Sequence, residues 1–232
     1  MTAPIQQLLD IMAQLRHPQN GCPWDLEQDY QSMIPYLLEE SYEVVEALQT
    51  ADFSALKEEL GDLLLQVIFL SQLAKEDQRF EFNDVVKTLC EKLIRRHPHV
   101  FGENKAENSE QALKNWEGKK QQERLAKQQS SLLDDVPHAL PALLRAEKLQ
   151  KRGKKLGFGT QSVEQTLNQA EQQLAAIKTA LHDNQNAQSA VSSLLFSISN
   201  LSRQLGLQAE SLLREENQRF EQAAREFEVK NT

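Results

Sequence analysis

The sequence predicts an all-α fold, and three features of the chain carry that prediction. Its 232 residues include only 8 Gly and 7 Pro, which are the residues that interrupt helices. Leu, Ala, Gln, Glu and Lys, which lose little side-chain freedom in a helix, are abundant. Apolar residues recur at helical spacing, beginning with Ile5, Leu8, Leu9, Met12 and Leu15. We therefore expect helices that pack through apolar faces.

The first half of the chain contains several predicted helices. Asp52 is expected to cap one of them, and its LGDLLLQVIFL segment is apolar on every side. That pattern predicts either the buried central helix of a bundle or a subunit interface. HPHVFGEN is predicted to be a loop. Besides the N-terminal helix, the pattern predicts helices at about 34–49, 52–75 and 83–96, and one that starts at Ser109.

The second half repeats the helical pattern of the first. Residues 130–140, which contain Pro137 and are followed by Pro141, are the expected linker between domains 1–129 and 141–232. A basic helix follows at 141–155, and three further helical stretches succeed it. Residues 37–48 align with 166–177, and residues 59–74 with 190–205, by their apolar positions. An offset of about 130 residues predicts a degenerate tandem duplication.

Composition excludes several functional classes. A formal net charge of −8 gives no field that would attract nucleic acid. Cys22 and Cys90 stand in no CxxC pattern, so neither a disulfide framework nor a zinc site is expected. The N-terminal segment lacks the basic region of a signal peptide, and no apolar run approaches the roughly 20 residues that a bilayer requires. We expect a cytoplasmic protein without membrane or nucleic-acid partners.

Two acidic motifs are the main candidates for chemistry. Glu40 and Glu43 lie one helical turn apart, as do Glu59 and Asp62 on the next predicted helix. If these helices are antiparallel, four carboxylates converge, and such a cluster needs a cation. Oxygen ligands without His or Cys favour Mg²⁺ or Mn²⁺. The alternatives are an ordinary solvated helix face and a di-iron bundle, but no His has a Glu three residues before it, as a di-iron site requires.

Four strings of the sequence together resemble the amino-terminal half of the MazG family, from about residue 5 to residue 155. They are GCPWDLEQ, PYLLEESYEVVEA, ELGDLLLQV and EKLIRRHPHVF. The resemblance implies an all-α nucleoside triphosphate pyrophosphohydrolase fold that is usually dimeric. It implies cleavage between the α and β phosphorus atoms, and metal ligation by Glu40, Glu43, Glu59 and Asp62. Glu39 completes the motif as a further ligand or as the catalytic group that orients the attacking water.

Cationic and aromatic residues further along the chain are candidates for binding substrate. Lys92, Arg95 and Arg96 share one helix face and are positioned for a triphosphate, although cations are also common at solvated helix C-termini. Trp116 and Lys120 resemble the family's late aromatic and basic pair. In that interpretation Trp116 stacks a base and Lys120 meets phosphate, while the alternative is a buried or interface tryptophan.

The second half departs from the family pattern at every acidic position. In the repeat alignment Glu39, Glu40, Glu43, Glu59 and Asp62 correspond to Asn168, Gln169, Gln172, Ala190 and Ser193. The apolar positions persist. The pattern therefore predicts a second domain that folds as a scaffold or dimerisation partner and binds no metal.

Together these features predict tandem MazG-like helical bundles that form a homodimer. The predicted function is Mg²⁺-dependent hydrolysis of nucleoside triphosphates to nucleoside monophosphate and pyrophosphate, which limits or cleans nucleotide pools. The main alternative is a non-catalytic or regulatory nucleotide- and metal-binding protein that has lost most turnover. A purely structural helical module is the third hypothesis.

Overall fold

The computed structural model describes residues 3–102, 106–126 and 131–231, and every regular element in these ranges is a helix. The all-α prediction is confirmed. The chain divides into two compact units, Met1–Gln122 and Glu123–Thr232. The predicted end of the first domain at residue 129 and the predicted start of the linker at residue 130 lie outside the described residues, so these boundaries stay a prediction.

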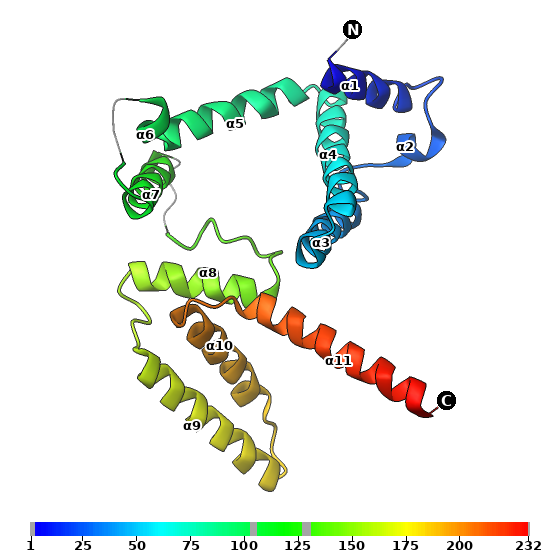
Figure 1. The fold of residues 1–232 in the computed structure, drawn as a ribbon. Coiled ribbons are helices and arrows are strands. Elements are labelled where there is room, and N and C mark those ends of the chain that lie inside the picture. Colours follow the sequence, from blue (N-terminus) through cyan, green and yellow to red (C-terminus); the bar gives the residue numbers. More distant parts are fainter. Residues whose placement is uncertain (1–2, 103–105, 127–130, 232) are drawn as a thin grey trace. The chain divides into compact units, whose positions relative to one another are not determined.

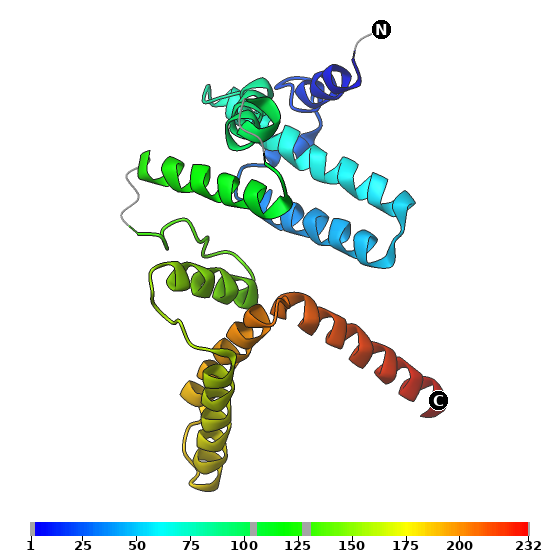
Figure 2. The same ribbon diagram turned by 60° about the vertical axis from the view of Figure 1, so that its left-hand side comes forward.

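The first unit is built around an antiparallel hairpin of two long helices, α3 and α4, which lie side by side in Figure 2. α1 and α5 both pack against α4, and α6 packs against α5. The predicted helix bounds are confirmed to within two residues, but the predicted HPHVFGEN loop contains the short helix α6. The helices are α1 (Pro4–Leu15), α2 (Pro23–Glu27), α3 (Ile34–Thr50), α4 (Phe53–Glu76), α5 (Phe82–Arg96), α6 (Pro98–Phe101) and α7 (Ser109–Ala126).

A two-residue turn joins α3 to α4. Ala51 adopts the left-handed conformation, with φ of 55°, and this reverses the chain directly after α3. Asp52 donates its backbone N–H to the carbonyl of Ala47 at 3.1 Å. Its side chain accepts hydrogen bonds from the backbone N–H groups of Ser54 and Ala55 at 3.0 and 3.1 Å. Asp52 is therefore the N-cap that the sequence predicts, and the turn fixes the register of the two helices.

The apolar core of the first unit occupies one end of the hairpin. Met12, Met33, Ile68, Phe69 and Leu73 form a buried cluster where α1 meets the second half of α4. The first half of α4 differs, because residues 60–62 and residue 64 are exposed. Of the two alternatives predicted for the LGDLLLQVIFL segment, burial within one chain therefore does not hold for its first half. Periodicity cannot distinguish a core within one chain from a subunit interface, and the latter stays a prediction.

Arg16 connects three parts of the first unit. Its side chain is 8% exposed, and its Nε and Nη2 atoms donate to the Glu76 carboxylate at 2.7–3.0 Å. Its Nη1 atom donates to the backbone carbonyls of Asp25 and Gln28. The guanidinium also lies 5.3 Å from the centroid of the Phe69 ring. The Arg16 guanidinium thus holds the end of α1, the α2 segment and the end of α4 together.

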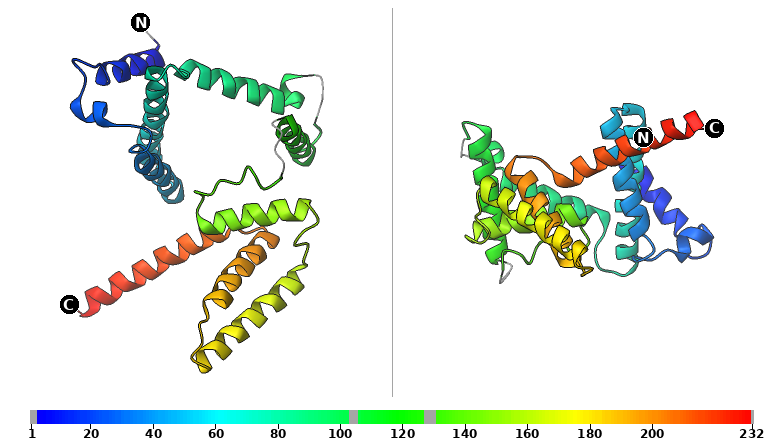
Figure 3. Two further views of the ribbon diagram at one scale, coloured as in Figure 1. Left: turned by 180° about the vertical axis from the view of Figure 1, so that it is seen from behind. Right: turned by 90° about the horizontal axis from the view of Figure 1, so that it is seen from below.

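The second unit repeats the helix order of the first. α9 and α10 form a hairpin, α8 packs on α10, and α11 follows α10 (Figure 3). The chain leaves both hairpins in the same way: Gln78 and Gly206 have positive φ, and the N–H groups of Arg79 and Leu207 bond carbonyls five residues earlier at 2.9 Å. The helices are α8 (Ala142–Lys155), α9 (Val163–His182), α10 (Gln188–Gln204) and α11 (Ala209–Asn231).

Replacing Arg16 with Met should lower the free energy of unfolding by about 2 kcal/mol, because Glu76 then keeps a partly buried charge without its partner. This figure is below the full cost for a buried pair, since the Glu76 side chain is 34% exposed. Urea unfolding followed by circular dichroism measures the loss. Arg79→Met is the matched control, because the Arg79–Asp77 pair is 69% and 47% exposed and should contribute less than about 1 kcal/mol. Equal losses in the two variants would refute the role of Arg16.

Candidate metal centre

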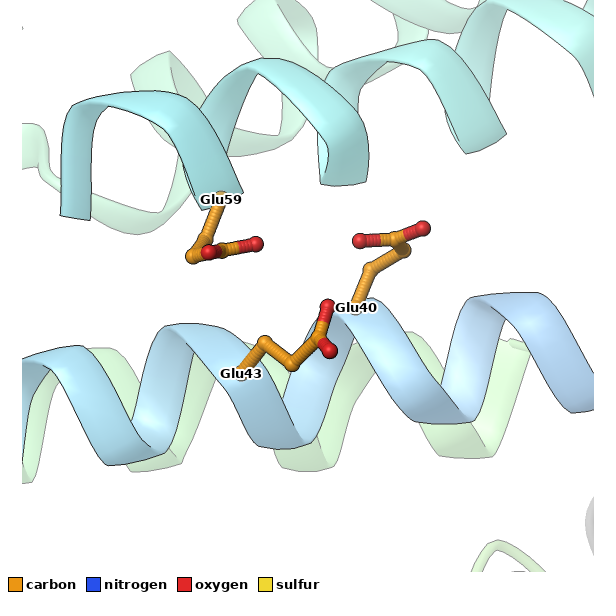
Figure 4. Close-up of side chains that lie close together, drawn as sticks. All are labelled: Glu40, Glu43 and Glu59. Atoms are coloured by element: carbon orange, nitrogen blue, oxygen red, sulfur yellow. The ribbon is translucent and has the colours of Figure 1, made fainter. Parts of the chain in front are cut away.

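The α3–α4 hairpin brings carboxylates from both helices together. Glu40 and Glu43 lie one turn apart on α3, and Glu59 lies on α4; Figure 4 shows all three side chains in the space between the helices. Each offers a carboxylate oxygen, and these oxygens lie within 4.8 Å of one another. In the part of the chain that the structure describes, this is the only group of three or more His, Cys, Asp or Glu residues with such spacing.

Electrostatic repulsion within this group favours the binding of a cation. Burial raises the pKa of Glu40, and the neighbouring charges of Asp62, Glu43 and Glu59 raise it further. Burial also raises the pKa of Glu59, and the charges of Glu43 and Asp62 add to that effect. A divalent cation would relieve this repulsion. Because all the donor atoms are carboxylate oxygens, the residues fit a hard cation such as Mg²⁺ or Mn²⁺.

Two other predicted acidic residues lie outside the group of three. Asp62 is exposed and is not within the 4.8 Å group, although its charge raises the pKa of Glu40 and of Glu59. Glu39 is also exposed and lies outside the group. The roles of Asp62 as a ligand and of Glu39 as a catalytic residue stay predictions.

Three of the five predicted substrate-binding residues lie together where α5 ends near α7. The charged groups of Arg96 and Lys120 lie 5.5 and 5.2 Å from the centroid of the Trp116 ring. We call Arg96, Trp116 and Lys120 the Trp116 cluster. Lys92 and Arg95 lie in the last two turns of α5, close to Arg96 in the chain. The structure therefore brings Arg96 beside Trp116 and Lys120, whereas Lys92 lines a separate hollow with Phe80 and Leu89.

Two histidines that the sequence analysis did not select lie beside the Trp116 cluster. His97 and His99 line a largely apolar hollow together with Leu113 and Trp116. Their position directly after Arg96 was the only signal in the sequence. Their imidazole rings lie 5.6 Å apart, next to the ring that is the candidate for stacking a base.

The carboxylates and the Trp116 cluster are not adjacent within one chain. α5 leads away from the α3–α4 hairpin, and α7 lies at its far end (Figure 1). Among the described residues, the extensive packing of the hairpin involves α1 and α5, and does not include α7. One chain therefore presents an anionic group and a cationic, aromatic group at separate places.

The second hairpin has a comparable hollow without acidic residues. The hollow between α9 and α10 is lined by Gln169, Gln172, Ala190 and Ser193, which are the counterparts of Glu40, Glu43, Glu59 and Asp62. The other residues that line it are Gln, Ala, Asn and Ser. The counterparts thus converge as the repeat alignment predicts, but they offer no carboxylate to a cation.

Without metal, Glu40→Gln should raise the melting temperature at neutral pH. A carboxyl whose pKa is raised by folding stabilises the protein below its unfolded pKa and loses that contribution as the pH rises through the folded pKa. For Glu40 this loss begins near the ordinary value of 4.5 and is complete above the raised pKa. Melting curves in EDTA from pH 4 to 8 test this, with Gln172→Ala as the control. A lower melting temperature for Glu40→Gln at pH 7 would contradict the expected repulsion.

Comparison with known proteins identifies the family. Residues 28–101, which include all four predicted ligands, match the model of the MazG nucleotide pyrophosphohydrolase domain. A nucleoside triphosphate pyrophosphohydrolase of Escherichia coli is 45% identical over 228 residues, covering 97% of this chain and 87% of that protein. The nucleoside triphosphate pyrophosphohydrolase/pyrophosphatase MazG of Thermotoga maritima is 40% identical over 223 residues, covering 96% and 85%. A crystal structure of a MazG-related protein from Thermotoga maritima aligns with 50% of this chain and 98% of that chain, at 30% identity and a TM-score of 0.43. This chain therefore belongs to the MazG family of nucleoside triphosphate pyrophosphohydrolases.

Proposed function

We propose that this protein hydrolyses nucleoside triphosphates to nucleoside monophosphate and pyrophosphate, with Mg²⁺ bound by the first hairpin. The observation that carries the proposal is the convergence of Glu40, Glu43 and Glu59, whose oxygens lie within 4.8 Å of one another. The two relatives compared over most of the chain are both named nucleoside triphosphate pyrophosphohydrolases. Family and geometry therefore support the same activity.

The acidic residues have distinct roles in this proposal. Glu40, Glu43 and Glu59 hold the metal, and Asp62, whose charge raises the pKa of Glu40 and of Glu59, contributes a fourth carboxylate. The metal, when bound, lowers the pKa of a coordinated water and neutralises charge on the phosphate oxygens. Glu39 is exposed beside the group, and we assign it the orientation of the attacking water.

The cationic residues neutralise the remaining charge of the triphosphate. Phosphoryl transfer requires mainly positioning and charge stabilisation from a protein. Lys92, Arg95 and Arg96 supply positive charge on α5, and Lys120 supplies it on α7. Trp116, which lines a largely apolar hollow, offers an aromatic face for the base.

We also propose that the protein is a homodimer. The exposed first half of α4 carries Leu60, Leu64 and Val67 at spacings of four and three residues, and these side chains share a helix face. α5 carries a second such stripe, formed by Val86, Leu89 and Leu93. Apolar stripes on neighbouring helices are typical of a surface that a second subunit covers.

The proposed cellular role is the limitation or cleaning of nucleotide pools in the cytoplasm. Among the described residues, no helix is both long and apolar enough to cross a membrane. Cys22 and Cys90 are free thiols, which agrees with a reducing compartment.

A regulatory nucleotide-binding protein is the second candidate function. The observation that favours it is the second hairpin, where the hollow equivalent to the metal group is lined by uncharged residues. If turnover requires both hairpins, this chain would bind metal and triphosphate but hydrolyse slowly.

Replacing Glu43 with Gln should lower kcat by about a hundredfold or more, because one metal ligand is lost. Pyrophosphate release from a panel of ribo- and deoxyribonucleoside triphosphates with Mg²⁺ measures the effect. Gln172→Ala, at the equivalent position of the second hairpin, should change the rate less than about twofold. If the wild type releases no pyrophosphate but triphosphate and Mg²⁺ raise its melting temperature, the regulatory function is correct instead.

Replacing Leu89 with Glu should dissociate the dimer, because a buried charge would then face the partner's apolar surface. Sedimentation velocity of the full chain measures the oligomeric state. Lys87→Gln, an exposed position on the same helix, should leave the dimer intact. A wild-type protein that sediments as a monomer at micromolar concentration would refute the proposal.

A further inference from the structure

The second hairpin contains a hollow that the proposed function does not use. It lies between α9, the connection that follows α9, and the first two turns of α10, and its volume is about 460 Å³. α9 and α10 lie side by side along their length (Figure 3). Both walls of the hollow therefore belong to one packed hairpin, so its shape does not depend on any other part of the chain.

The polar groups that line this hollow are amides and hydroxyls. They include the side chains of Gln169, Gln173, Asn186, Ser189 and Ser193. A side-chain amide presents a hydrogen-bond donor and an acceptor in one plane. Since no charged residue lines the hollow, the charge of a metal ion or a phosphate group would not be compensated there. The hollow thus suits an uncharged ligand that both donates and accepts hydrogen bonds.

The amide of Gln173 is the group that most directly calls for a ligand. Its Oε1 atom is buried and has no hydrogen-bond partner among the described residues. Gln150 and Gln204 also have a buried Oε1 without a partner, but their Nε2 atoms donate to backbone carbonyls at 2.9 and 2.8 Å. Gln173 has no such anchor in the described part of the chain. Because a buried acceptor without a donor is unfavourable, a ligand that donates to Gln173 supplies a bond that the hairpin itself does not make.

The substitutions between the two hairpins remove charge and keep hydrogen-bonding capacity. Gln169 and Gln172 stand at the positions of Glu40 and Glu43, and glutamine has the length and shape of glutamate. If the second hairpin served only as a scaffold, apolar side chains in the hollow would stabilise it more. The retained amides therefore favour a changed ligand over the simple loss of a site.

A nucleobase has the shape and the hydrogen-bonding groups that this hollow accommodates. The small side chains of Ala176, Ala180, Ala187 and Ala190 line the remainder of the hollow and leave room for a flat ring. A glutamine amide pairs with the edge of adenine, where it accepts from the exocyclic amine and donates to a ring nitrogen. Uracil and hypoxanthine carry a carbonyl in place of that amine, and a carbonyl cannot donate to Gln173 Oε1.

We infer that the second hairpin binds an uncharged nucleoside without metal, through a base whose exocyclic amine donates to Gln173 Oε1. This inference goes beyond the proposed function, because it requires neither a triphosphate nor the carboxylates of the first hairpin. It stands or falls independently of hydrolysis. It also gives a ligand to a domain that the sequence predicts to be a scaffold.

Isothermal titration calorimetry of the full chain in EDTA tests the inference with four nucleosides. Adenosine and cytidine should bind. Inosine and uridine should bind about tenfold more weakly or worse, because their carbonyl leaves Gln173 Oε1 unpaired. Equal affinities for adenosine and inosine, or no heat from any of the four nucleosides at millimolar concentration, would overturn the inference.

Variants of the full chain locate the bound nucleoside. Gln173→Leu keeps the size of the side chain and removes the acceptor, so adenosine affinity should fall about tenfold and the preference over inosine should disappear. Gln222→Leu is the matched control, because Gln222 is an exposed glutamine on α11 outside the hollow, and it should bind adenosine as the wild type does. Trp116→Ala should also leave adenosine binding unchanged. Loss of binding in Trp116→Ala together with full binding in Gln173→Leu would place the nucleoside in the first unit and refute the inference.

Circular dichroism establishes that each variant folds. If Gln173→Leu does not fold, Ser193→Ala replaces it, because Ser193 is exposed and its substitution removes a hydroxyl from the same hollow. Adenosine affinity should fall in that variant too, and an unchanged affinity would then contradict the inference.

Discussion

The two-residue turn between α3 and α4 is the constraint on which the candidate metal centre depends. One residue more or less in this turn would rotate the following side chains by about 100° around α4 and carry Glu59 away from Glu40 and Glu43. Ala51 holds a left-handed conformation that costs a non-glycine residue about 1–2 kcal/mol, and the cap provided by Asp52 offsets about 1 kcal/mol of that. The register of the candidate site is thus maintained by two residues that lie outside the group of carboxylates.

The packed core of the first unit and the group of carboxylates lie at opposite ends of the first hairpin. Arg16, Glu76 and the buried cluster around Phe69 hold α1 and the end of α4 together, whereas the carboxylates lie where α4 has no core within the chain. Repulsion among the carboxylates can therefore be tolerated, because the packed end supplies the stability that the site lacks. A partly exposed site also leaves room for a large, charged substrate.

Much of the fold and part of the site could be predicted from the sequence, because both depend on local spacing. Apolar periodicity located the long helices, and the i, i+3 spacing placed Glu40 and Glu43 on one face. Spacing could not show that the first half of α4 is exposed, since an apolar helix suits a core and a subunit interface equally. Spacing also could not predict that Arg16 pairs with Glu76, which is 60 residues away. It could not show that α5 carries the Trp116 cluster away from the carboxylates, because the direction of α5 depends on the corner at residues 77–81.

Comparison of the two hairpins shows which residues are needed for folding and which are not. α9 and α10 pack as α3 and α4 do, and their hollow gathers Gln169, Gln172 and Ser193. The hairpin therefore folds without carboxylates, so folding does not explain why Glu40, Glu43 and Glu59 converge in the first unit. Three carboxylates with two raised pKa values destabilise the metal-free hairpin, whereas a bound cation stabilises it through linkage. Because the neutral counterpart lacks both effects, the acidic group is best explained by ligand binding.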